Sequence, residues 1–391
     1  MTSPRILIVD DEPFNIDYLE QELEELDYEI LSACDGPQAL AQVEDGSPDL
    51  ILLDIMMPGM DGFEVLSRLK TDPSHRDIPV IVISANNAMP SVIQGIQLGA
   101  EDYLPKPFEP ALLKARIASC LEKKRLRDLQ KLYLKSLQRE LEIGREIQQG
   151  FLPAEMPRVP GWEIAACFQA AREVAGDFYD GFLLPDGALV CIVGDVCGKG
   201  VGAALFMTLF RSLIRATCTT DYFLGKAVQY ALTPADRLRH VITFTNEYIT
   251  GTHAEANMFA TIFIGMFDLQ TGGLTYINAG HEPPLLLKAA CPPEPLRPTG
   301  PAVGIIPAAG YSTKEASLQP GNVLFAFTDG ITDAVNPENI RFGAERLADL
   351  LQGPLTSSAR LLASIQEELG QFIGSADPFD DITMVGIKRE I

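Results

Sequence analysis

The sequence predicts an α/β protein of two domains, and three observations lead to this prediction. Over residues 5–107, short apolar runs alternate with amphipathic stretches, which is typical of a doubly wound, five-stranded parallel sheet covered by helices on both faces. From residue 109 to about 150, a helical pattern replaces the strands. Beyond residue 162, strand-like runs and long helices indicate an α+β layered sandwich. A chain of 391 residues is long enough to form both cores.

The first domain is expected from five apolar runs of strand length. They read RILIVD, YEILSA, DLILLDI, IPVIVISA and EDYLPKP. Four stretches with helical spacing separate them, at residues 15–26, 36–43, 61–71 and 89–98. In a doubly wound sheet, ligands bind at the carboxyl ends of the strands, so the residues that close these runs are the first candidates for a site.

The segment after the first domain is expected to be one long helix with an apolar stripe. The stripe has spacings of three and four residues and consists of Leu126, Leu129, Tyr133, Leu137 and Leu141. Two interpretations stay open: the helix packs on its own domain, or it forms a coiled-coil homodimer that joins two domains. Three prolines in FLPAEMPRVPG end the helix. We therefore expect domains at residues 1–120 and 151–391, with a linker at 121–150.

The second domain is expected from seven strand-like runs. They read WEIAACFQAA, GALVCIVGDV, MFATIFIGMFD, GLTYINAG, PPLLLK, NVLFAFTDG and DITMVGIKRE. Long helices interrupt them near residues 202–218, 342–351 and 358–372. The turn-like LQTGGL indicates that some of these strands pair as antiparallel hairpins, which fits a layered α+β domain better than a parallel one.

Composition and charge exclude several classes of function. The chain has 31 Lys and Arg residues against 53 Asp and Glu residues, a formal net charge of −22, which repels nucleic acids and anionic lipids. The 7 cysteines form no C-x-x-C pair, as expected of reduced thiols. No uninterrupted apolar run approaches the roughly 18 residues that span a bilayer, and the start MTSP leads directly into a strand. We expect a cytoplasmic protein with no membrane and no nucleic-acid partner.

Polar side chains close four of the five runs in the first domain. Asp10 and Asp11 follow the first run, Asp54 the third, Ser84 the fourth and Lys106 the fifth. These ends share one edge of the sheet, and carboxylates packed together there repel each other unless a cation lies among them. Mg²⁺ prefers such oxygen ligands, and an Asp beside it can act as a nucleophile toward a phosphoryl group.

Residues 1 to about 120 resemble the receiver domain of two-component response regulators. The resemblance is carried by VDDEP, LLDIMMPGMDGFEVL, VISA and LPKPF. It implies a flavodoxin-like fold, and Asp54 as the phosphoacceptor for a sensor histidine kinase. It implies three further protein groups at the Mg²⁺: Asp11 directly, Asp10 through water, and the Met56 carbonyl. It also implies that Ser84 and Lys106 hold the phosphoryl oxygens, and that Tyr103 is the aromatic residue whose rotation reports phosphorylation.

A second set of aspartates lies at strand ends in the second domain. The glycine-rich GDVCGKGVG is not a P-loop, because Lys199 lies between two glycines and no Ser or Thr follows. The informative residue there is Asp195, and comparable positions hold Asp177, Asp180, Asp329, Asp380 and Asp381. Asp-Gly pairs also occur simply as turns. Several buried carboxylates in one cleft, however, would hold two divalent cations that activate a water.

Residues from about 143 onward resemble the metal-dependent protein serine/threonine phosphatases of type 2C, in the SpoIIE/RsbU-like branch. The matching stretches are EIGREIQQGFLP, VAGDFYD, GDVCGKGVGAALFM, MFATIFIGMFD, NAGHEPPLLL, FTDGITDA and FDDITMVGI. The resemblance implies two Mn²⁺ or Mg²⁺ ions. Asp195 would bridge both, the Val196 carbonyl and Asp177 would bind one, and Asp329 and Asp380 the other.

Three assignments at this second site stay open. The ligand next to the last strand is Asp380 or Asp381, and the resemblance favours Asp380. Lys199 either steadies the substrate phosphate or is a solvated loop lysine. His281 is interpreted as a structural loop residue rather than a catalytic one.

Together, the two resemblances imply a response regulator whose output domain is a phosphatase. Its substrate would be a phosphorylated Ser/Thr protein, and in this branch the usual substrate is an anti-sigma-factor antagonist. The alternatives are a non-catalytic adaptor that uses the phosphatase fold for docking, and a DNA-binding regulator. The presence of all the expected aspartates opposes the first, and the acidic charge opposes the second.

Overall fold

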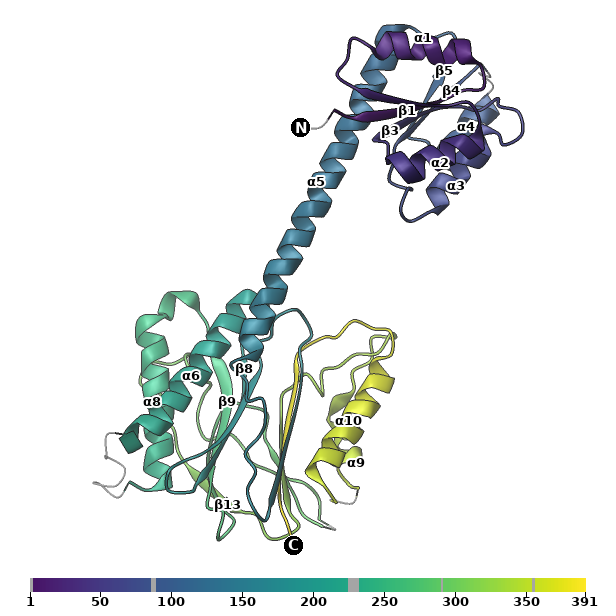
Figure 1. Cartoon of the computed structure of the whole chain (residues 1–391). Helices are drawn as coiled ribbons and strands as arrows, with labels where there is room; N and C mark the ends of the chain where they lie inside the picture. Colours follow the sequence, from purple (N-terminus) through teal and green to yellow (C-terminus); the bar gives the residue numbers. More distant parts are fainter. Residues whose placement is uncertain (1–2, 86–88, 224–231, 290, 354–355) are drawn as a thin grey trace. The chain divides into compact units, whose positions relative to one another are not determined.

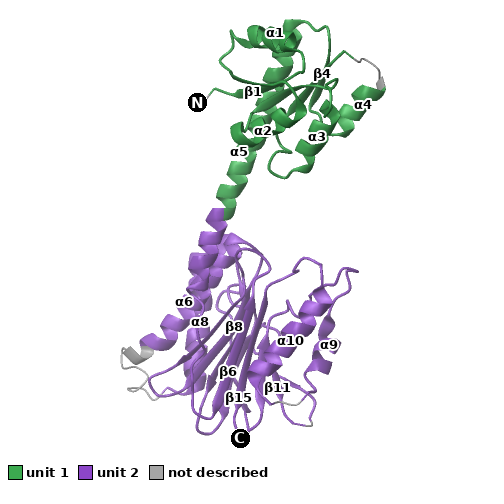
Figure 2. Cartoon of the chain, turned by 45° about the vertical axis from the view of Figure 1, so that its right-hand side comes forward, with its two compact units in different colours: residues 1–138 green, residues 139–391 purple. Residues whose placement is uncertain are grey.

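The computed structural model describes residues 3–85, 89–223, 232–289, 291–353 and 356–391. The chain divides into two compact units, Met1–Gln138 and Arg139–Ile391 (Figure 2). The boundary lies within a single helix, α5 (Pro110–Gln149). Each unit has its own core and is described by itself.

The first unit is a doubly wound parallel sheet, as the sequence predicts. Its strand order is β2-β1-β3-β4-β5, and all the pairs are parallel (Figure 1). The strands are β1 (Arg5–Val9), β2 (Glu29–Ala33), β3 (Leu50–Asp54), β4 (Val80–Ser84) and β5 (Asp102–Pro105). The helices are α1 (Pro13–Leu23), α2 (Gly36–Gly46), α3 (Gly62–Thr71) and α4 (Met89–Gln97), followed by α5.

The central strands are buried on both faces, which explains their near-continuous apolar sequence. Every residue of β3 and β4 is buried. Two helices begin at aspartates that cap them: Asp35 accepts from the Gln38 amide at 2.8 Å, and Asp61 from the Glu64 amide at 2.8 Å. In the register of the sheet, Val9 pairs with Leu53, and Asp54 with Ile83, so the strands end side by side.

Helix α5 is helical over the whole expected linker, but its apolar stripe does not pack on the first unit. Its first turns are buried in that unit's core through Leu113, Ile117 and Cys120. Farther along, Leu126, Leu129, Tyr133 and Leu137 are 42–69% exposed. The interpretation that the stripe packs on its own domain is therefore wrong for these positions, whereas the coiled-coil interpretation stays a prediction.

The second unit contains two five-stranded antiparallel sheets with helices. The strand orders are β13-β10-β9-β8-β7 and β12-β11-β14-β15-β6. The strands of the first sheet are β7 (Phe178–Leu183), β8 (Leu189–Val196), β9 (Ala260–Phe267), β10 (Gly273–Ala279) and β13 (Lys314–Ser317). Those of the second are β6 (Trp162–Gln169), β11 (Leu285–Leu287), β12 (Glu294–Pro295), β14 (Val323–Phe327) and β15 (Ile382–Arg389). The helices are α6 (Val201–Phe223), α8 (Pro234–Thr252), α9 (Gly343–Leu350) and α10 (Ser358–Ile373), with a 3-10 turn η1 (Ala254–Ala256).

The side chains of β8 show how the layers are arranged. Val190 and Ile192 lie in the core that includes residues of α6 and α8. Leu189, Cys191 and Val193 alternate with them and pack against residues of the second sheet, such as Leu324. Residues of α9 and α10 cover the other face of that second sheet. The unit is therefore a four-layer sandwich, with helices, two sheets and helices in order (Figure 1).

Helix α6 qualifies the expectation that no segment could span a membrane. By length and composition alone, the segment Val201–Thr220 could cross a membrane. In the sequence, Arg211 and Arg215 interrupt its apolar residues. One face of this helix, including Met207, Phe210 and Ile214, is buried in the core of the second unit. The helix thus has a packing role that accounts for its apolar residues.

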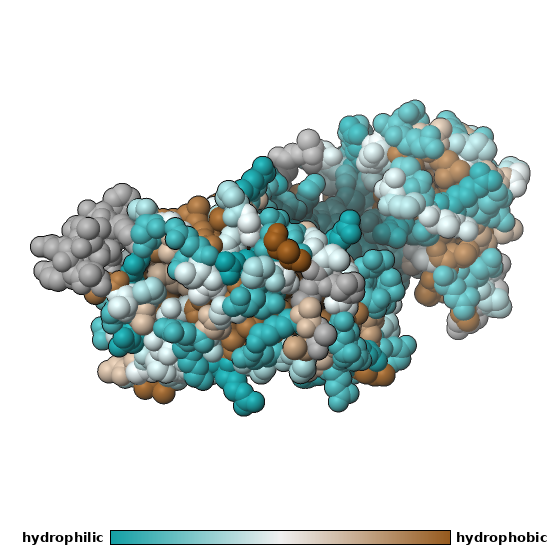
Figure 3. Space-filling view, turned by 90° about the horizontal axis from the view of Figure 1, so that it is seen from below, coloured by the Kyte–Doolittle hydropathy of each residue, from teal (hydrophilic) through white to brown (hydrophobic). Residues whose placement is uncertain are grey.

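The exposed surface is mostly polar. On the face drawn in Figure 3, hydrophilic side chains predominate, and apolar ones appear as separate patches among them. The net charge of −22 opposes binding of nucleic acid.

Two candidate carboxylate sites

Asp10, Asp11 and Asp54 converge at one edge of the first unit's sheet. One carboxylate oxygen from each lies within 4.8 Å of the others, and of all the described residues only these form such a group of three. Asp10 and Asp54 are buried, and Asp11 is partly exposed. Three hard oxygen donors at this separation fit a magnesium ion.

Lys106 neutralises part of this charge. Its Nζ lies 2.7 Å from an Asp10 oxygen and 3.1 Å from an Asp54 oxygen. Burial alone would lower the pKa of Lys106, but the hydrogen bond to Asp10 and the charges of Asp54 and Asp10 outweigh it and raise that pKa. Lys106 therefore stays protonated at the place where a phosphoryl group on Asp54 would need a cation.

The remaining predicted residues of the first unit surround this group. Ser84 is buried at the end of β4, and its carbonyl accepts from the Lys106 amide at 2.9 Å. The Met56 amide lies 3.4 Å from an Asp54 oxygen, while the Met56 side chain is exposed. Tyr103 packs half-buried against the core on the α3 side of the sheet.

A glycine lets helix α3 begin against the Asp54 backbone. A Cβ on Gly62 would lie 2.1 Å from the Asp54 carbonyl oxygen, so only glycine fits there. The sequence also did not reveal Asn15, which donates to Asp10 at 2.9 Å and orients that carboxylate. An Asn in the first turn of an amphipathic helix carries no signal of such a role.

In the second unit, Asp177 and Asp195 meet where β7 begins and β8 ends. The pairing of Phe178 with Gly194 places them next to each other, and their carboxyls share a hydrogen bond. Asp177 also accepts from Thr328 at 2.6 Å and from Thr383 at 2.7 Å, which belong to the opposite sheet. These two threonines, not recognised in the sequence, fix Asp177 between the sheets.

Asp329 and Asp380 add further negative charge to this site. Burial, followed by repulsion from Asp329 and Asp380, raises the pKa of Asp195 to about 7. Burial and the charge of Asp195 raise the pKa of Asp177, and burial together with Asp380 raises that of Asp329. The raised pKa values show that nearby positive charge does not balance these carboxylates, and their oxygens are the donors that Mg²⁺ and Mn²⁺ prefer. The residues present therefore fit divalent cations.

Lys199 forms an ion pair with one of the aspartates of this second site. Its Nζ lies 2.8 Å from an Asp380 oxygen and 4.6 Å from the centre of the Phe379 ring. Lys199 is thus not a freely solvated lysine. A single partly exposed ammonium offsets only part of the charge, since the pKa of Asp329 stays raised although Lys199 acts to lower it.

Asp381 and Asp380 differ in what their oxygens bind. Both carboxylate oxygens of Asp381 accept backbone amides, from Ala171 at 2.8 Å and from Gly176 at 2.8 Å. Asp380 instead pairs with Lys199, and the backbone amide that it accepts from is that of its neighbour Asp381 at 2.9 Å. Asp381 therefore fixes the backbone before Asp177 through hydrogen bonds. The carboxylate of Asp380 is the better candidate of the two for binding a cation.

Asp180 does not belong to this site, contrary to the expectation from the sequence. It lies in β7 three residues after Asp177, so its side chain emerges on the opposite face, toward α6. It is fully buried and forms ion pairs with Arg211 at 2.9 Å and with Arg215 at 2.7 Å. These ion pairs satisfy Asp180 and attach α6 to the sheet.

His281 has the structural surroundings expected of it. It is buried, its amide donates to Asn278 Oδ1 at 2.8 Å, and its Nδ1 lies 2.9 Å from Thr261 Oγ1. Burial lowers its pKa to about 4, so the ring is neutral near pH 7. A neutral, enclosed imidazole is a poor source of protons for a substrate.

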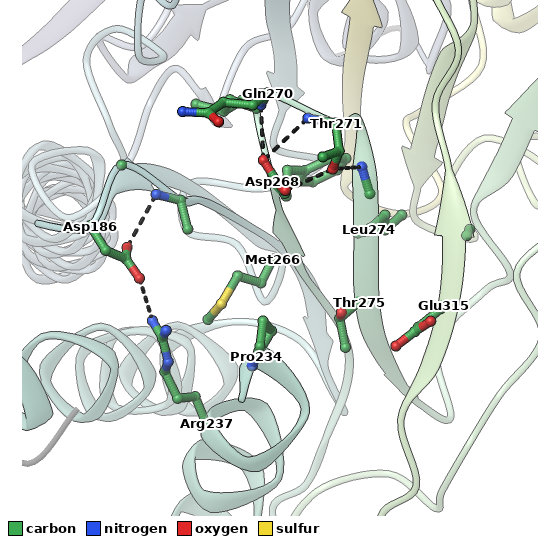
Figure 4. A pocket seen from close by; sticks show the side chains of 16 residues that line it. Asp186, Pro234, Arg237, Met266, Asp268, Gln270, Thr271, Leu274, Thr275 and Glu315 are labelled. Carbon is green, nitrogen blue, oxygen red and sulfur yellow. Dashed lines mark hydrogen bonds and ion pairs between the residues drawn. The ribbon is translucent and has the colours of Figure 1, made fainter. Parts of the chain in front are cut away.

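A large pocket of the second unit is separate from these aspartates. It has a volume of about 580 Å³ and is lined by residues of the β7–β8 and β9–β10 turns and of α8 (Figure 4). Two of its acidic side chains are already paired: Asp186 with Arg237 at 2.9 Å, and Asp268 with the amides and hydroxyl of its own turn. Neither Asp177 nor Asp195 lines it, so the chemistry is expected elsewhere.

The fold and the two sites define a receiver domain joined to a phosphatase-type sandwich, and comparisons with known proteins agree. The family model for stage II sporulation protein E (SpoIIE) matches residues 185–390, and that for the response regulator receiver domain matches residues 6–118. The chain belongs to the SpoIIE family and carries a receiver domain before the family domain. The SpoIIE match includes Asp195, Asp329 and Asp380 but begins after Asp177.

Individual relatives resemble different parts of the chain. Protein IcfG of Synechocystis is 41% identical over 268 residues, which are 64% of this chain and 41% of that protein. Response regulator PleD of Caulobacter vibrioides is 50% identical over 117 residues, which are 30% of this chain and 26% of that protein. The chain thus covers less than half the length of either relative.

A solved structure supports the fold of the second unit. The SiaA-PP2C domain of Pseudomonas aeruginosa superposes with a TM-score of 0.54 and 20% identity, over 66% of this chain and 98% of that domain. At this identity the likeness shows the fold alone. The fold class predicted for both domains is confirmed.

Removing the Asp180 carboxylate should destabilise the second unit. We expect Asp180→Ala to lower its free energy of unfolding by about 3 kcal/mol, because Arg211 is left buried without its partner. Asp186→Ala breaks the more exposed pair with Arg237 and should cost less than about 1 kcal/mol. Urea unfolding of both variants measures the difference, and equal losses would contradict the structural role of Asp180.

Binding of Mn²⁺ at the second site should weaken as the pH falls. Since the pKa of Asp195 is raised to about 7, a cation must displace a proton at pH 6 but not at pH 8. We expect about tenfold weaker apparent affinity at pH 6. Calorimetric titration of a chain that also carries Asp11→Asn isolates the second site.

The raised pKa of Asp195 also predicts how the stability of the cation-free second unit depends on pH. The folded state holds the Asp195 proton more tightly than the unfolded state, so its contribution to stability is lost as the pH rises through about 7. In EDTA, the Tm of the second unit should therefore be lower at pH 8 than at pH 6. Affinity and Tm that do not change between these pH values would refute the electrostatic description of the site.

Proposed function

We propose that this chain is a response regulator whose output is the metal-dependent dephosphorylation of phosphoserine or phosphothreonine in a partner protein. The observation that carries the proposal is the group of four aspartates in the second unit, with the raised pKa values of Asp177, Asp195 and Asp329. Such a group is costly to fold without cations, so a binding function accounts for it better than a structural one.

The resemblance to the type 2C phosphatases assigns the residues that would hold two Mn²⁺ or Mg²⁺ ions. Asp195 would bridge both ions, Asp177 and the Val196 carbonyl would bind one, and Asp329 and Asp380 the other. Bound cations supply positive charge for the phosphoryl oxygens and lower the pKa of a water that can attack phosphorus. The chain's own contribution is to hold the carboxylates in place, through Thr328 and Thr383 on Asp177.

Lys199 and Asp381 would support this chemistry in different ways. The Lys199 ammonium pairs with Asp380 at 2.8 Å and so lies beside the aspartates, where it would bind a phosphoryl oxygen of the substrate. Asp381 fixes the Ala171 and Gly176 amides and so the loop before Asp177.

The first unit would receive the signal. We propose Asp54 as the phosphoacceptor, with a Mg²⁺ ion held by Asp10, Asp11 and the Met56 carbonyl, and with Lys106 and Ser84 on the phosphoryl oxygens. The phosphoryl donor is a sensor histidine kinase. The proximity of Lys106 to both Asp10 and Asp54 supports this assignment.

The substrate class comes from the resemblance to the SpoIIE/RsbU-like branch: a phosphorylated anti-sigma-factor antagonist in the cytoplasm. The exposed stripe of α5 supports a homodimer through this helix. The alternative function is a non-catalytic adaptor that docks partners by the same fold. It is disfavoured because an adaptor has no use for carboxylates held so close that repulsion raises the pKa of Asp177, Asp195 and Asp329.

Asp329→Asn should abolish phosphatase activity. Removing one negative ligand weakens cation binding, and we expect the rate with Mn²⁺ to fall by about 100-fold or more. Hydrolysis of p-nitrophenyl phosphate and of a phosphoserine protein gives the rate, and acetyl phosphate labelling of Asp54 should be unchanged. The control is Asp333→Asn, whose carboxylate pairs with Arg341. Turnover near that of the wild type at saturating Mn²⁺ would exclude the proposed site.

Asp54→Asn should prevent phosphorylation by acetyl phosphate, since an amide cannot act as the nucleophile. The phosphatase rate of this variant should also not respond to beryllofluoride, whereas that of the wild type should change. Mass spectrometry of the intact chain and the rate with and without beryllofluoride test both points. An acid-labile phosphoryl group formed at the wild-type rate would mean that another residue is the acceptor.

A further inference from the structure

Lys199 connects two loops of the second unit that lie 180 residues apart in the sequence. Its Nζ donates to the Phe379 carbonyl at 2.5 Å, pairs with an Asp380 oxygen at 2.8 Å and lies 4.6 Å from the centre of the Phe379 ring. An ammonium has three N–H donors and no acceptor, so these contacts use most of its capacity. The Lys199 ammonium therefore has a defined position on the segment that precedes β15.

Both carboxylate oxygens of Asp380 have a partner within the chain. Oδ1 accepts from the Asp381 amide at 2.9 Å, and Oδ2 binds the Lys199 ammonium at 2.8 Å. A divalent cation that binds Oδ2 would lie beside the Lys199 ammonium, and two positive charges so close to each other repel strongly. Lys199 and a divalent cation therefore compete for the same oxygen of Asp380.

The surroundings of Lys199 leave room for its side chain to move away from Asp380. A Cβ on Gly198 or Gly200 would meet no residue within 4 Å except its chain neighbours, so the space on both sides of Lys199 is open. The Lys199 side chain is 34% exposed, and its stem has several rotatable bonds. An ammonium that leaves Asp380 needs another anion, and a phosphoryl group bound at the aspartates would supply it.

The charges around Asp380 favour this exchange. Burial, followed by the charge of Asp380, raises the pKa of Asp329, and Lys199 acts in the opposite direction without offsetting them. Asp380 also contributes to the raised pKa of Asp195. One ammonium thus leaves the carboxylates unbalanced, whereas a divalent cation brings twice the charge to the same place. The cation is therefore favoured over Lys199 at Asp380.

We propose that Lys199 is an exchangeable counter-ion, which binds Asp380 until a divalent cation takes its place and then binds the phosphoryl group of the substrate. Lys199 thereby lowers the affinity of the site for one of its two cations, and its binding of the phosphoryl group depends on that cation. This inference rests on the proposed function and deepens it, because it links the binding of a cation to the binding of the substrate through one side chain.

The test measures Mn²⁺ binding by calorimetry in the full-length chain, with Asp11→Asn present so that the second site is titrated alone. Lys199→Met removes the ammonium and keeps a stem of similar length. Because the ion pair is partly exposed, we expect one of the two Mn²⁺ ions to bind about fourfold more tightly. The KM for p-nitrophenyl phosphate should rise about tenfold, and inorganic phosphate should inhibit less strongly. Lys199→Arg keeps the charge and should resemble the wild type.

Two controls separate competition at Asp380 from a general effect of charge. Lys288→Met makes the same change at a lysine that pairs with Glu294, and it should alter neither Mn²⁺ affinity nor KM. In a chain with Asp380→Asn, Lys199 has lost its anionic partner. Adding Lys199→Met to that chain should therefore leave the affinity for the remaining Mn²⁺ ion within about twofold.

Several results would overturn the inference. They are unchanged or weaker Mn²⁺ binding in Lys199→Met, an equal gain in Lys288→Met or in the Asp380→Asn chain, and tighter Mn²⁺ binding with an unchanged KM. If Lys199→Met does not fold, as judged by Tm in EDTA, Lys199→Gln must show the same changes. A wild-type chain that binds Mn²⁺ without hydrolysing phosphate esters would refute the proposed function, whereas an active wild type whose Mn²⁺ affinity does not depend on Lys199 refutes only this inference.

Discussion

Repulsion between carboxylates that are confined at strand ends is the constraint on which both sites depend. In the first unit, Lys106 reaches two of the three aspartates, so much of the repulsion is offset inside the protein. In the second unit, the pKa values of Asp177, Asp195 and Asp329 are raised even though Lys199 pairs with Asp380. The second site therefore depends more on cations from solution than the first does.

Holding such groups together requires anchors that do not themselves bind the cation. Thr328 and Thr383 hold Asp177 in this way; Thr328 directly follows β14, and Thr383 lies in β15 of the opposite sheet. Asp381 does the same for the loop before Asp177 through two backbone amides. The two-sheet architecture is thus part of the site: one sheet supplies Asp177 and Asp195, and the other supplies their restraints together with Asp329 and Asp380.

The sequence predicts the first unit more completely than the second because of how the strands run. In a parallel sheet, all the carboxyl ends lie at one edge, so the convergence of Asp10, Asp54 and Lys106 follows from the apolar runs alone. In an antiparallel sheet, the face of each strand must also be known. Asp180 was counted among the candidate aspartates for this reason, whereas its side chain binds Arg211 and Arg215 of α6. The buried Gln148 of α5 was not recognised because a glutamine in a polar helix looks solvent-exposed.

Helix α5 also could not be understood from its sequence pattern alone. The stripe predicts an apolar contact along its length, yet the buried apolar contacts with the first unit lie near the start of the helix, at Leu113 and Ile117. Lys124, Arg127 and Lys131 farther along reach that unit only as ion pairs, with Asp49, Glu101 and Asp77. In the second unit, Gln148 makes the polar contact near the other end of the helix. An isolated helix between such ends is only marginally stable in water, and ion pairs such as Lys124 with Asp128 add a few tenths of a kcal/mol each. A partner that covers the exposed leucines would stiffen the helix. A stiffer helix would pass a displacement more completely to its last turn, where Gln148 binds the Ala175 backbone.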